Sequence, residues 1–480
     1  MRRKNELILL LLLFLLTLCV RLFLISKGPY HYDCLELLIS SQKTLQTHQL
    51  QYMHGAGYPL TVLIGAFFLL VFGHWSPVFA INLIGVIFST ACIPALYCLV
   101  RRLLDANAAF FSAVLLSFLP GLLSVSIYGN NNAVSLFFIL LSALFMLRAL
   151  SGKGTFGLAW SGLCLGASAG CRLPDVIFFL PLAVLYFSGA GFNRRSLKDF
   201  FLSFLVPFAA VPALLYYPMF ARGELKQLLA VPEQMGGKYL GPFSRLLGGS
   251  SAIFINLVSP PVLMSALGGL FCLIRENRTK LFYFLLVWFA VTFFFYANIS
   301  TMEARMLDIA AVPVAVMAGF LLSRVYKIMP AGGALLLAVI AGMMFFFIYP
   351  ALKFRHDHNF QESFSHWVRK NTPADSVVIS GDEWIFLDYY AQRQALHKPW
   401  SCDGFSTGDF LGKIDRDLDE GRKVFILESV ISTDRCGLFR KSAQQKYRLV
   451  RFGWHYNEDW HHACLATHVY RDSLLELKIK

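Results

Sequence analysis

The chain has 480 residues, of which 56% are hydrophobic, 15% aromatic and 15% charged, and this composition is too apolar to be buried in water-soluble cores. Its formal net charge of +14 does not indicate a nucleic-acid-binding protein, because Lys and Arg occur in short clusters between apolar runs and not on one basic face. We therefore expect an integral membrane protein, with membrane lipids and no nucleic acid among its partners.

Eleven apolar runs are long enough to cross the hydrocarbon core of a bilayer, which takes roughly 17–25 residues per helix. The first run follows basic residues, as in a signal peptide, but no small-residue cleavage site precedes Arg21, so we predict a retained first helix. Together the runs define a transmembrane module over residues 1–350. They fall near residues 7–25, 77–100, 108–128, 133–150, 156–171, 175–190, 199–220, 251–274, 281–298, 307–323 and 331–350.

A further apolar run, residues 60–72, is shorter and suits an interfacial helix better than a span. If it does not cross, every basic cluster falls on one side, which satisfies the positive-inside rule at each loop. These clusters are Arg2/Arg3/Lys4, Arg101/Arg102, Arg148/Lys153, Arg194/Arg195/Lys198, Arg275/Arg278/Lys280 and Arg324/Lys327. A span at 60–72 would place all later clusters opposite the first. We therefore predict a cytoplasmic amino terminus and a first outer loop over 27–76 that contains an interfacial helix.

The composition changes after residue 350, where Pro, Asp, Glu, Arg and His become frequent. Short strand-like runs and helix-like stretches there predict a small α/β domain over residues 351–480. The predicted strands are 376–380, 423–427, 447–452 and 466–471, and the predicted helices are 360–370 and 385–392. The same topology places this domain on the outer face, which is the periplasm if the membrane is a bacterial inner membrane, as the compact tail favours. Of the ten Cys, only Cys402, Cys436 and Cys464 are candidates for a disulfide, and their pairing stays open.

The first outer loop carries two carboxylates directly after the first helix, Asp33 and Glu36, in the sequence Tyr-His-Tyr-Asp-Cys-Leu-Glu. Side chains three residues apart share one face of a helix. An ionisable group at the bilayer boundary is costly and so indicates function, although a loop carboxylate can also be simply solvated. Further along, His54 and Tyr58 lie in the sequence His-Gly-Ala-Gly-Tyr-Pro-Leu, which leads into the interfacial run.

This layout resembles the GT-C superfamily of glycosyltransferases, and within it the protein O-mannosyltransferase-like branch, which has two prolines where this chain has Gly55 and Ala56. The resemblance implies transfer of a sugar from a polyprenyl-phosphate donor to a hydroxyl of a lipid, protein or glycan acceptor on the outer membrane face. In such an inverting transfer a carboxylate accepts the hydroxyl proton, and we predict Asp33 as this base. Glu36 would orient the acceptor or bind a divalent metal, the one cofactor that the chemistry suggests.

A late outer loop contains Glu303 and Arg305 ahead of an apolar run with Pro313. It resembles the family loop in which an Arg meets the phosphate of the donor. Arg can hold phosphate oxygens through two parallel hydrogen bonds, but an interfacial Arg can also simply reach the lipid head groups. The resemblance favours a donor-phosphate contact by Arg305, with Glu303 in support.

Two further outer turns hold candidate residues. Arg172 and Asp175 flank a proline where the family often carries an Arg with a nearby Asp, so Arg172 is a second donor-phosphate candidate and Asp175 a supporting residue. A structural ion pair that holds the turn is an equally good interpretation. Asn131 is a candidate substrate contact in an Asn-rich turn, although Asn also favours turns for its backbone alone. His54 and Tyr58 complete the set of substrate-binding or supporting residues.

Two other functions compete with glycosyl transfer. A transporter or flippase typically shows inverted repeats and charges in mid-span, and nearly every charge here is at the end of a run. A lipid-glycan ligase or polymerase of cell-envelope synthesis would share the carrier but would depend on a long outer loop and not on Asp33.

Overall fold

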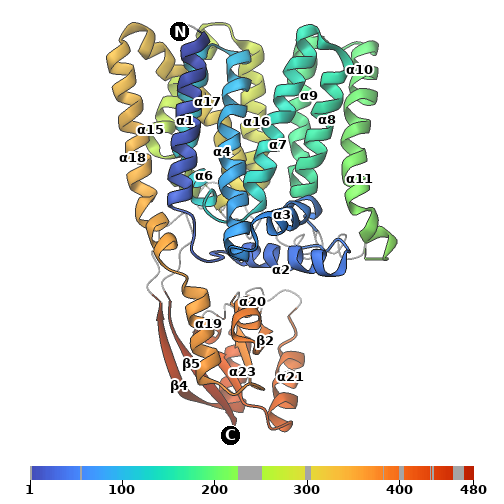
Figure 1. Ribbon diagram of the computed structural model, residues 1–480, viewed down its shortest axis with the longest axis vertical. Coiled ribbons are helices and arrows are strands. Elements are labelled where there is room, and N and C mark those ends of the chain that lie inside the picture. Colours follow the sequence, from blue (N-terminus) through green and yellow to red (C-terminus); the bar gives the residue numbers. More distant parts are fainter. Residues whose placement is uncertain are drawn as a thin grey trace. The chain divides into compact units, whose positions relative to one another are not determined.

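The computed structural model describes residues 3–53, 57–224, 251–297, 304–381, 383–398, 405–432, 434, 437–457 and 470–480. Their contacts form two compact units. The first unit, residues 3–25 and 37–353, is a bundle of helices, and the second, residues 26–36, 354–457 and 470–480, is a small α/β unit (Figure 1). His54, Glu303 and the three candidate disulfide cysteines lie outside the described residues.

The bundle is built from long apolar helices. Among the described residues, eight helices are long and apolar enough to cross a membrane, or nine if one bent pair counts as a single span. The main helices in these spans are α1 Arg3–Phe23, α4 Pro77–Leu103, α7 Asn131–Arg148, α9 Phe179–Ala190, α11 Val206–Ala221, α16 Thr279–Ala297, α17 Asp308–Ile328 and α18 Pro330–Asp357. The spans that contain α9 and α11 are longer than these helices and cover Leu173–Ala190 and Arg194–Ala221. Shorter apolar helices include α5 Ala106–Phe118 and α8 Gly154–Cys171. The predicted class, a polytopic helical membrane protein, is confirmed, and the total of eleven crossings stays a prediction.

Two of the predicted runs are broken helices. The run over 251–274 consists of α14 Ser251–Val258 and α15 Pro260–Arg275, which meet at an angle of 92°. The break is at Ser259, whose φ of 77° is left-handed and therefore incompatible with a continuing helix. The run over 108–128 likewise divides after α5, and a short helix, α6 Pro120–Val125, begins at a proline. In both places the proline occupies the first turn of a new helix, where its missing N–H costs nothing.

The predicted interfacial run forms α3 Pro59–Phe72, a helix of 14 residues. At 1.5 Å per residue it is about 21 Å long, less than the roughly 30 Å of hydrocarbon in a bilayer. Figure 1 shows α3 and α2 Tyr32–Thr47 lying across one end of the bundle and not along it. Ser41 on α2 donates a hydrogen bond to the Val62 carbonyl on α3 at 3.2 Å, which ties the two helices together.

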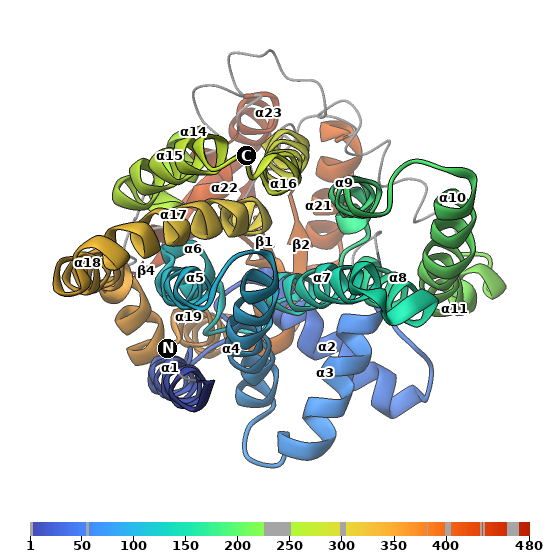
Figure 2. The same ribbon diagram turned by 90° about the horizontal axis from the view of Figure 1, so that it is seen from above.

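Basic side chains gather at one end of the bundle. Arg101 at the end of α4 contacts Glu6 near the start of α1 at 3.3 Å. Arg324 near the end of α17 binds Glu276, just after α15, at 2.6 Å, and approaches Asp105, just before α5, at 3.5 Å. Figure 2 shows the same helices end on, with α7 beside α4 and α8, and α17 beside α5 and α15. The clusters therefore share one end, and which side of a membrane this end faces stays a prediction.

The second unit is a five-stranded mixed sheet with helices. Its strand order is β2-β1-β3-β5-β4, with β1 parallel to both β2 and β3, and β5 antiparallel to both β3 and β4. Strands β1 and β3 are buried at every residue, as expected for apolar strands covered on both faces. The strands are β1 Val377–Ser380, β2 Gln394–His397, β3 Val424–Leu427, β4 Tyr447–Asn457 and β5 Tyr470–Ile479, and the main helices are α19 Phe360–Asn371, α21 Thr407–Asp419 and α23 Leu438–Lys446.

Candidate functional site

The predicted base, Asp33, lies in the first turn of α2. The partial positive charge of a helix N-terminus stabilises a carboxylate at this position. Its side chain is 15% exposed, and Oδ1 lies 3.8 Å from Nδ1 of His31. The same Nδ1 accepts the backbone N–H of Asp33 at 3.1 Å, so the proton of a neutral His31 is on Nε2. His31 was not predicted as a site residue, yet its ring lies beside the proposed base.

The segment that leads into Asp33 is held by the carboxyl-terminal part of the chain. The Lys27 N–H donates to the Arg355 carbonyl at 3.0 Å. The buried Arg355 guanidinium stacks on the Tyr30 ring at 3.8 Å, and Gln361 donates to the Tyr30 carbonyl at 2.8 Å. These contacts explain why residues 26–36 belong to the second unit although more than 300 residues of sequence separate them from Arg355.

Glu36 follows Asp33 by three residues on α2, as the sequence predicted. Both side chains therefore lie on one face of the helix. Glu36 is half-buried, and its Oε2 is shielded from solvent. The two carboxylates together can receive a hydroxyl group and take up its proton, but the placement alone does not divide these roles between them.

A second group of predicted residues is buried in the helical unit. Arg172 and Asp175 flank the start of the 3₁₀ turn η2 Leu173–Phe178, and Nε of Arg172 lies 3.9 Å from Oδ2 of Asp175. Tyr296 from α16 and Ser135 from α7 each donate a short hydrogen bond to the Asp175 carboxylate. The Arg172 guanidinium also lies over the Tyr296 ring at 4.9 Å. Asp175 thus has both oxygens occupied by protein donors, which favours the structural interpretation for this residue.

Arg172 itself is only partly satisfied by these contacts. Its Nη1 is buried and makes no hydrogen bond within the described part of the chain. A buried donor without a partner is costly, and it is rare in native proteins unless a ligand or water completes it. Arg172 can therefore receive an anion from the side that Asp175 leaves open.

Arg305 and Asp308 lie close to Arg172. Arg305 is in the 3₁₀ turn η5 Ala304–Leu307, Asp308 begins α17, and both are buried, with exposed fractions of 9% and 4%. Electrostatic interactions couple Arg172 with Arg305 and Tyr58, and couple Asp308 with both arginines. The structure therefore brings together four of the predicted residues, Arg172, Asp175, Arg305 and Tyr58.

Asp308 is the functional candidate that the sequence did not reveal. Neither carboxylate oxygen has a hydrogen-bond partner among the described residues, in contrast to Asp175. A Cβ added to Gly121 on α6 would lie 2.6 Å from Oδ1, so the approach of the carboxylate to this turn requires a glycine. The only available signal was an acid three residues after Arg305 at the start of an apolar run.

Tyr58 is positioned by an unusual turn. Gly57 has a φ of 87° and Tyr58 a φ of 45°, so two consecutive residues are left-handed before Pro59 begins α3. A Cβ on Gly57 would meet the ring of Tyr216 at 2.9 Å and that of Tyr52 at 3.0 Å, so only glycine fits here. The Gly-Tyr-Pro sequence is therefore required by the backbone conformation that places Tyr58 near Arg172.

The other predicted residues have different outcomes. Asn131 is buried in the first turn of α7, four residues before Ser135 and therefore on the same face of the helix. The preceding residue, Asn130, caps the helix, because its side chain accepts a hydrogen bond from the Ala133 N–H at 3.1 Å. His54 and Glu303 lie outside the described residues, so their roles stay predictions. No three His, Cys, Asp or Glu side chains converge within the described ranges, so these residues do not form a metal site of the usual kind.

Solved structures with this fold were found across the whole chain. The crystal structure of ArnT from Cupriavidus metallidurans bound to undecaprenyl phosphate has a TM-score of 0.65 at 11% identity, covering 99% of this chain and 98% of that one. AglB from Archaeoglobus fulgidus, an oligosaccharyltransferase solved with an inhibitory peptide and a dolichol-phosphate, has a TM-score of 0.61 at 15% identity, covering 98% and 74%. The mycobacterial arabinofuranosyltransferase AftD has a TM-score of 0.56 at 11% identity, covering 100% and 40%. At these identities the likeness shows the common GT-C fold.

The fold and the buried polar cluster define a multispanning membrane protein of the GT-C class. Residues 55–217 match the family model described as dolichyl-phosphate-mannose-protein mannosyltransferase. No curated protein gives a significant match. The family match covers residues 55–217, and the fold of the described residues is the GT-C fold that the first loop led us to expect.

Proposed function

We propose that this protein is a glycosyltransferase that moves a sugar from a polyprenyl-phosphate donor to an acceptor hydroxyl with inversion at the anomeric carbon. The observation that carries the proposal is the buried pair of guanidinium groups, Arg172 and Arg305, with Nη1 of Arg172 left without a hydrogen bond in the described structure. Arg binds phosphate through paired, charge-assisted hydrogen bonds, and these strengthen where water is excluded. ArnT and AglB, which share the fold, were solved with undecaprenyl phosphate and dolichol-phosphate.

In this proposal Asp33 accepts the proton of the acceptor hydroxyl. A polyprenyl phosphate is a good leaving group, so no acid is required, and the two arginines stabilise the charge that develops on it. Glu36 orients the acceptor from the same face of α2. The acceptor is a lipid, a protein or a glycan, and the proposal is independent of which one it is.

Asp308 supplies a third function. A carboxylate without protein donors, buried beside two arginines, is suited to accept hydrogen bonds from sugar hydroxyl groups. In this proposal Arg172 and Arg305 therefore bind the phosphate of the donor, Asp308 binds its sugar, and Asp33 receives the acceptor.

Donor binding can be tested without knowing the sugar or the acceptor. Undecaprenyl phosphate binding to purified protein in nanodiscs should weaken by about 10- to 100-fold in Arg305→Ala, as expected for loss of a charged hydrogen bond. The matched control is Arg195→Ala, whose side chain is 92% exposed. Equal binding by Arg305→Ala and wild type would remove Arg305 from the donor site.

Chemistry can be tested with Asp33→Asn, which keeps the size and removes the base. Membranes that contain the protein should transfer labelled hexose from undecaprenyl-phosphate-linked donors, and the variant should lose at least about 100-fold in rate while undecaprenyl phosphate binding is unchanged. Full transfer by Asp33→Asn would exclude this residue as the base.

The proposed orientation, in a bacterial inner membrane with an outward carboxyl-terminal unit, has a separate test. A phosphatase that is active only in the periplasm, fused after Lys480, should be active. An inactive but stably expressed fusion would reverse the topology.

A further inference from the structure

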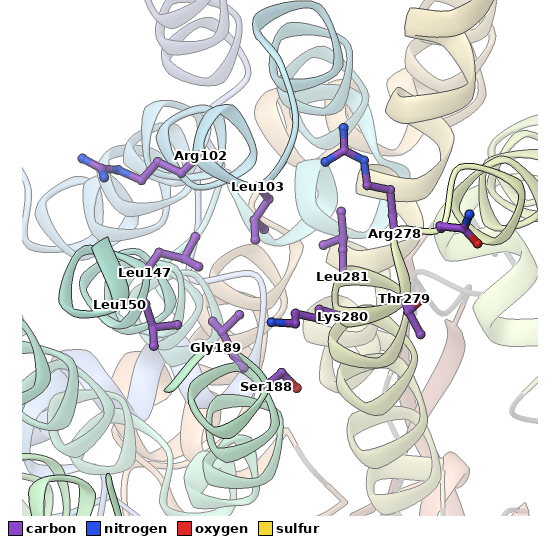
Figure 3. A pocket seen from close by; sticks show the side chains of 12 residues that line it. Arg102, Leu103, Leu147, Leu150, Ser188, Gly189, Arg278, Thr279, Lys280 and Leu281 are labelled. Atoms are coloured by element: carbon purple, nitrogen blue, oxygen red, sulfur yellow. The ribbon is translucent and has the colours of Figure 1, made fainter. Parts of the chain in front are cut away.

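A cavity of about 500 Å³ lies at the basic end of the helical bundle, away from the buried arginine pair in sequence and structure. It is formed where α4, α7 and α9 end and where α16 begins (Figure 3). Lys280 extends into it, and Arg102 and Arg278 lie at its rim. Its walls are apolar, with leucines from α7 and α9, among them Leu147 and Leu185.

None of the three cationic side chains forms an ion pair or a hydrogen bond with a carboxylate in the described structure, although Arg278 interacts electrostatically with Glu276. The carboxylates at this end are already engaged, Glu6 by Arg101 and Glu276 by Arg324. The cavity therefore combines an excess of positive charge with an apolar wall.

The position of the cavity matches the level of lipid head groups. Each surrounding helix is an apolar span that ends or begins at this point, Leu103 being the last residue of α4, Ala190 the last of α9 and Thr279 the first of α16. A phosphate held here would have hydrocarbon on one side and water on the other. Basic pockets between transmembrane helices are typical sites for anionic lipid head groups.

We propose that this cavity binds one anionic phospholipid, with its phosphodiester on Lys280, an acyl chain along the leucines, and Arg102 and Arg278 adding positive charge at the rim. The competing explanation is that the cations only offset the partial negative charge at the C-termini of α4, α7 and α9. That explanation predicts no preference among lipids. Free phosphate has the same charged group as the lipid head, but it has no apolar part that could pack against the leucines.

The test compares phosphatidylglycerol with phosphatidylcholine by native mass spectrometry of protein released from nanodiscs of each lipid. Wild type should retain phosphatidylglycerol and not phosphatidylcholine. A near-surface cation contributes about fivefold in affinity, so Arg102→Gln/Arg278→Gln/Lys280→Gln should lose on the order of 100-fold. The control Arg194→Gln/Arg195→Gln removes two exposed arginines of α10 Arg194–Phe200, outside the cavity, and should retain the lipid.

Three results would overturn the proposal: equal retention of both lipids by wild type, retention by the triple variant, or an equal loss in the control. Displacement of the lipid by millimolar glycerol phosphate would assign the site to free phosphate and would also overturn it. If the triple variant does not fold, Lys280→Gln alone should weaken retention about fivefold, and unchanged retention in that variant would count against the lipid.

Discussion

Replacing Asp175 with Asn would remove the charge from the centre of the buried cluster while nearly conserving its shape. The carboxylate faces Arg172 and accepts hydrogen bonds from Tyr296 and Ser135. Asn has a single acceptor oxygen, but Ser135 also contacts Ser168 at 2.6 Å and can donate there instead. The main consequence is therefore an uncompensated, buried guanidinium group.

The magnitude follows from the geometry of the pair. Nε of Arg172 is 3.9 Å from Oδ2 of Asp175, and the two side chains are 6% and 0% exposed. Opposite unit charges at this distance attract by about 4 kcal/mol at an effective dielectric constant of about 20. Breaking a buried pair by removing one partner typically costs about 3–5 kcal/mol, in agreement with that value.

The assay is the midpoint of thermal unfolding of the full chain in nanodiscs, which should fall by on the order of 5 °C. Asp199→Asn is the matched control, because its pair with Arg195 has a similar length of 4.0 Å but is exposed and should contribute under about 1 kcal/mol. Undecaprenyl phosphate should bind Asp175→Asn more tightly, since the freed Arg172 charge favours an anion. Equal midpoints for the two variants would refute the structural role assigned to Asp175.

Two further predictions concern stability. Gly269→Ala should destabilise the bundle by about 1–3 kcal/mol, because the added Cβ would lie 1.9 Å from a carbonyl oxygen of α17. The control Gly268→Ala should cost less, because its Cβ meets only a flexible leucine side chain. The midpoints of thermal unfolding of the two variants measure the difference. Lys398→Met should destabilise the α/β unit by about 3–5 kcal/mol because it leaves the buried carboxylate of Asp434, 3.0 Å away, without its cation. The control Lys446→Met breaks an exposed ion pair and should lower the stability of the unit by under about 1 kcal/mol. Hydrogen exchange of the amides of β1 and β3 measures the stability of both variants.

The sequence predicted where the apolar helices lie but not where they break. Composition and length are enough to locate a span, because lipid demands an uninterrupted apolar helix. Proline is ambiguous in such runs: Pro94 and Pro313 lie inside continuous helices, whereas Pro120 and Pro260 begin new ones. Neighbouring helices decide which outcome occurs, and that information is not local.

In the carboxyl-terminal unit β1, β3 and the first part of β4 were predicted, β2 was missed, and β5 was predicted at 466–471 although it is Tyr470–Ile479. Residues 377–380 and 424–427 are continuous apolar runs in the middle of the sheet. Strand β2, with a polar sequence and exposed ends, pairs only with β1 and has no such signal. Edge strands depend on the register of their neighbour more than on their own residues.

The candidate site could be predicted in part because charged residues are easily recognised in loops. Functional residues inside apolar spans have no such signal in the sequence. Arg172 and Arg305 stand out in loops between apolar runs, and the family resemblance gave them a role. Tyr296 and Ser135 are unremarkable residues of their helices, and only the packing of α16 and α7 around η2 turns them towards Asp175. Whether Tyr296 and Ser135 face Asp175 depends on how each helix is rotated about its axis, and the spacing of residues in the sequence does not determine that rotation.

The contacts of residues 26–36 give the carboxyl-terminal unit a part in positioning the proposed base. Asp33 follows a segment fixed by Arg355 and Gln361, and α2 then continues into the helical unit, where Ser41 bonds to α3. The proposed phosphate-binding arginines belong wholly to the helical unit. Donor binding should therefore depend on the bundle alone, whereas the position of Asp33 depends on the contacts that Arg355 and Gln361 make with residues 26–36 inside its own unit.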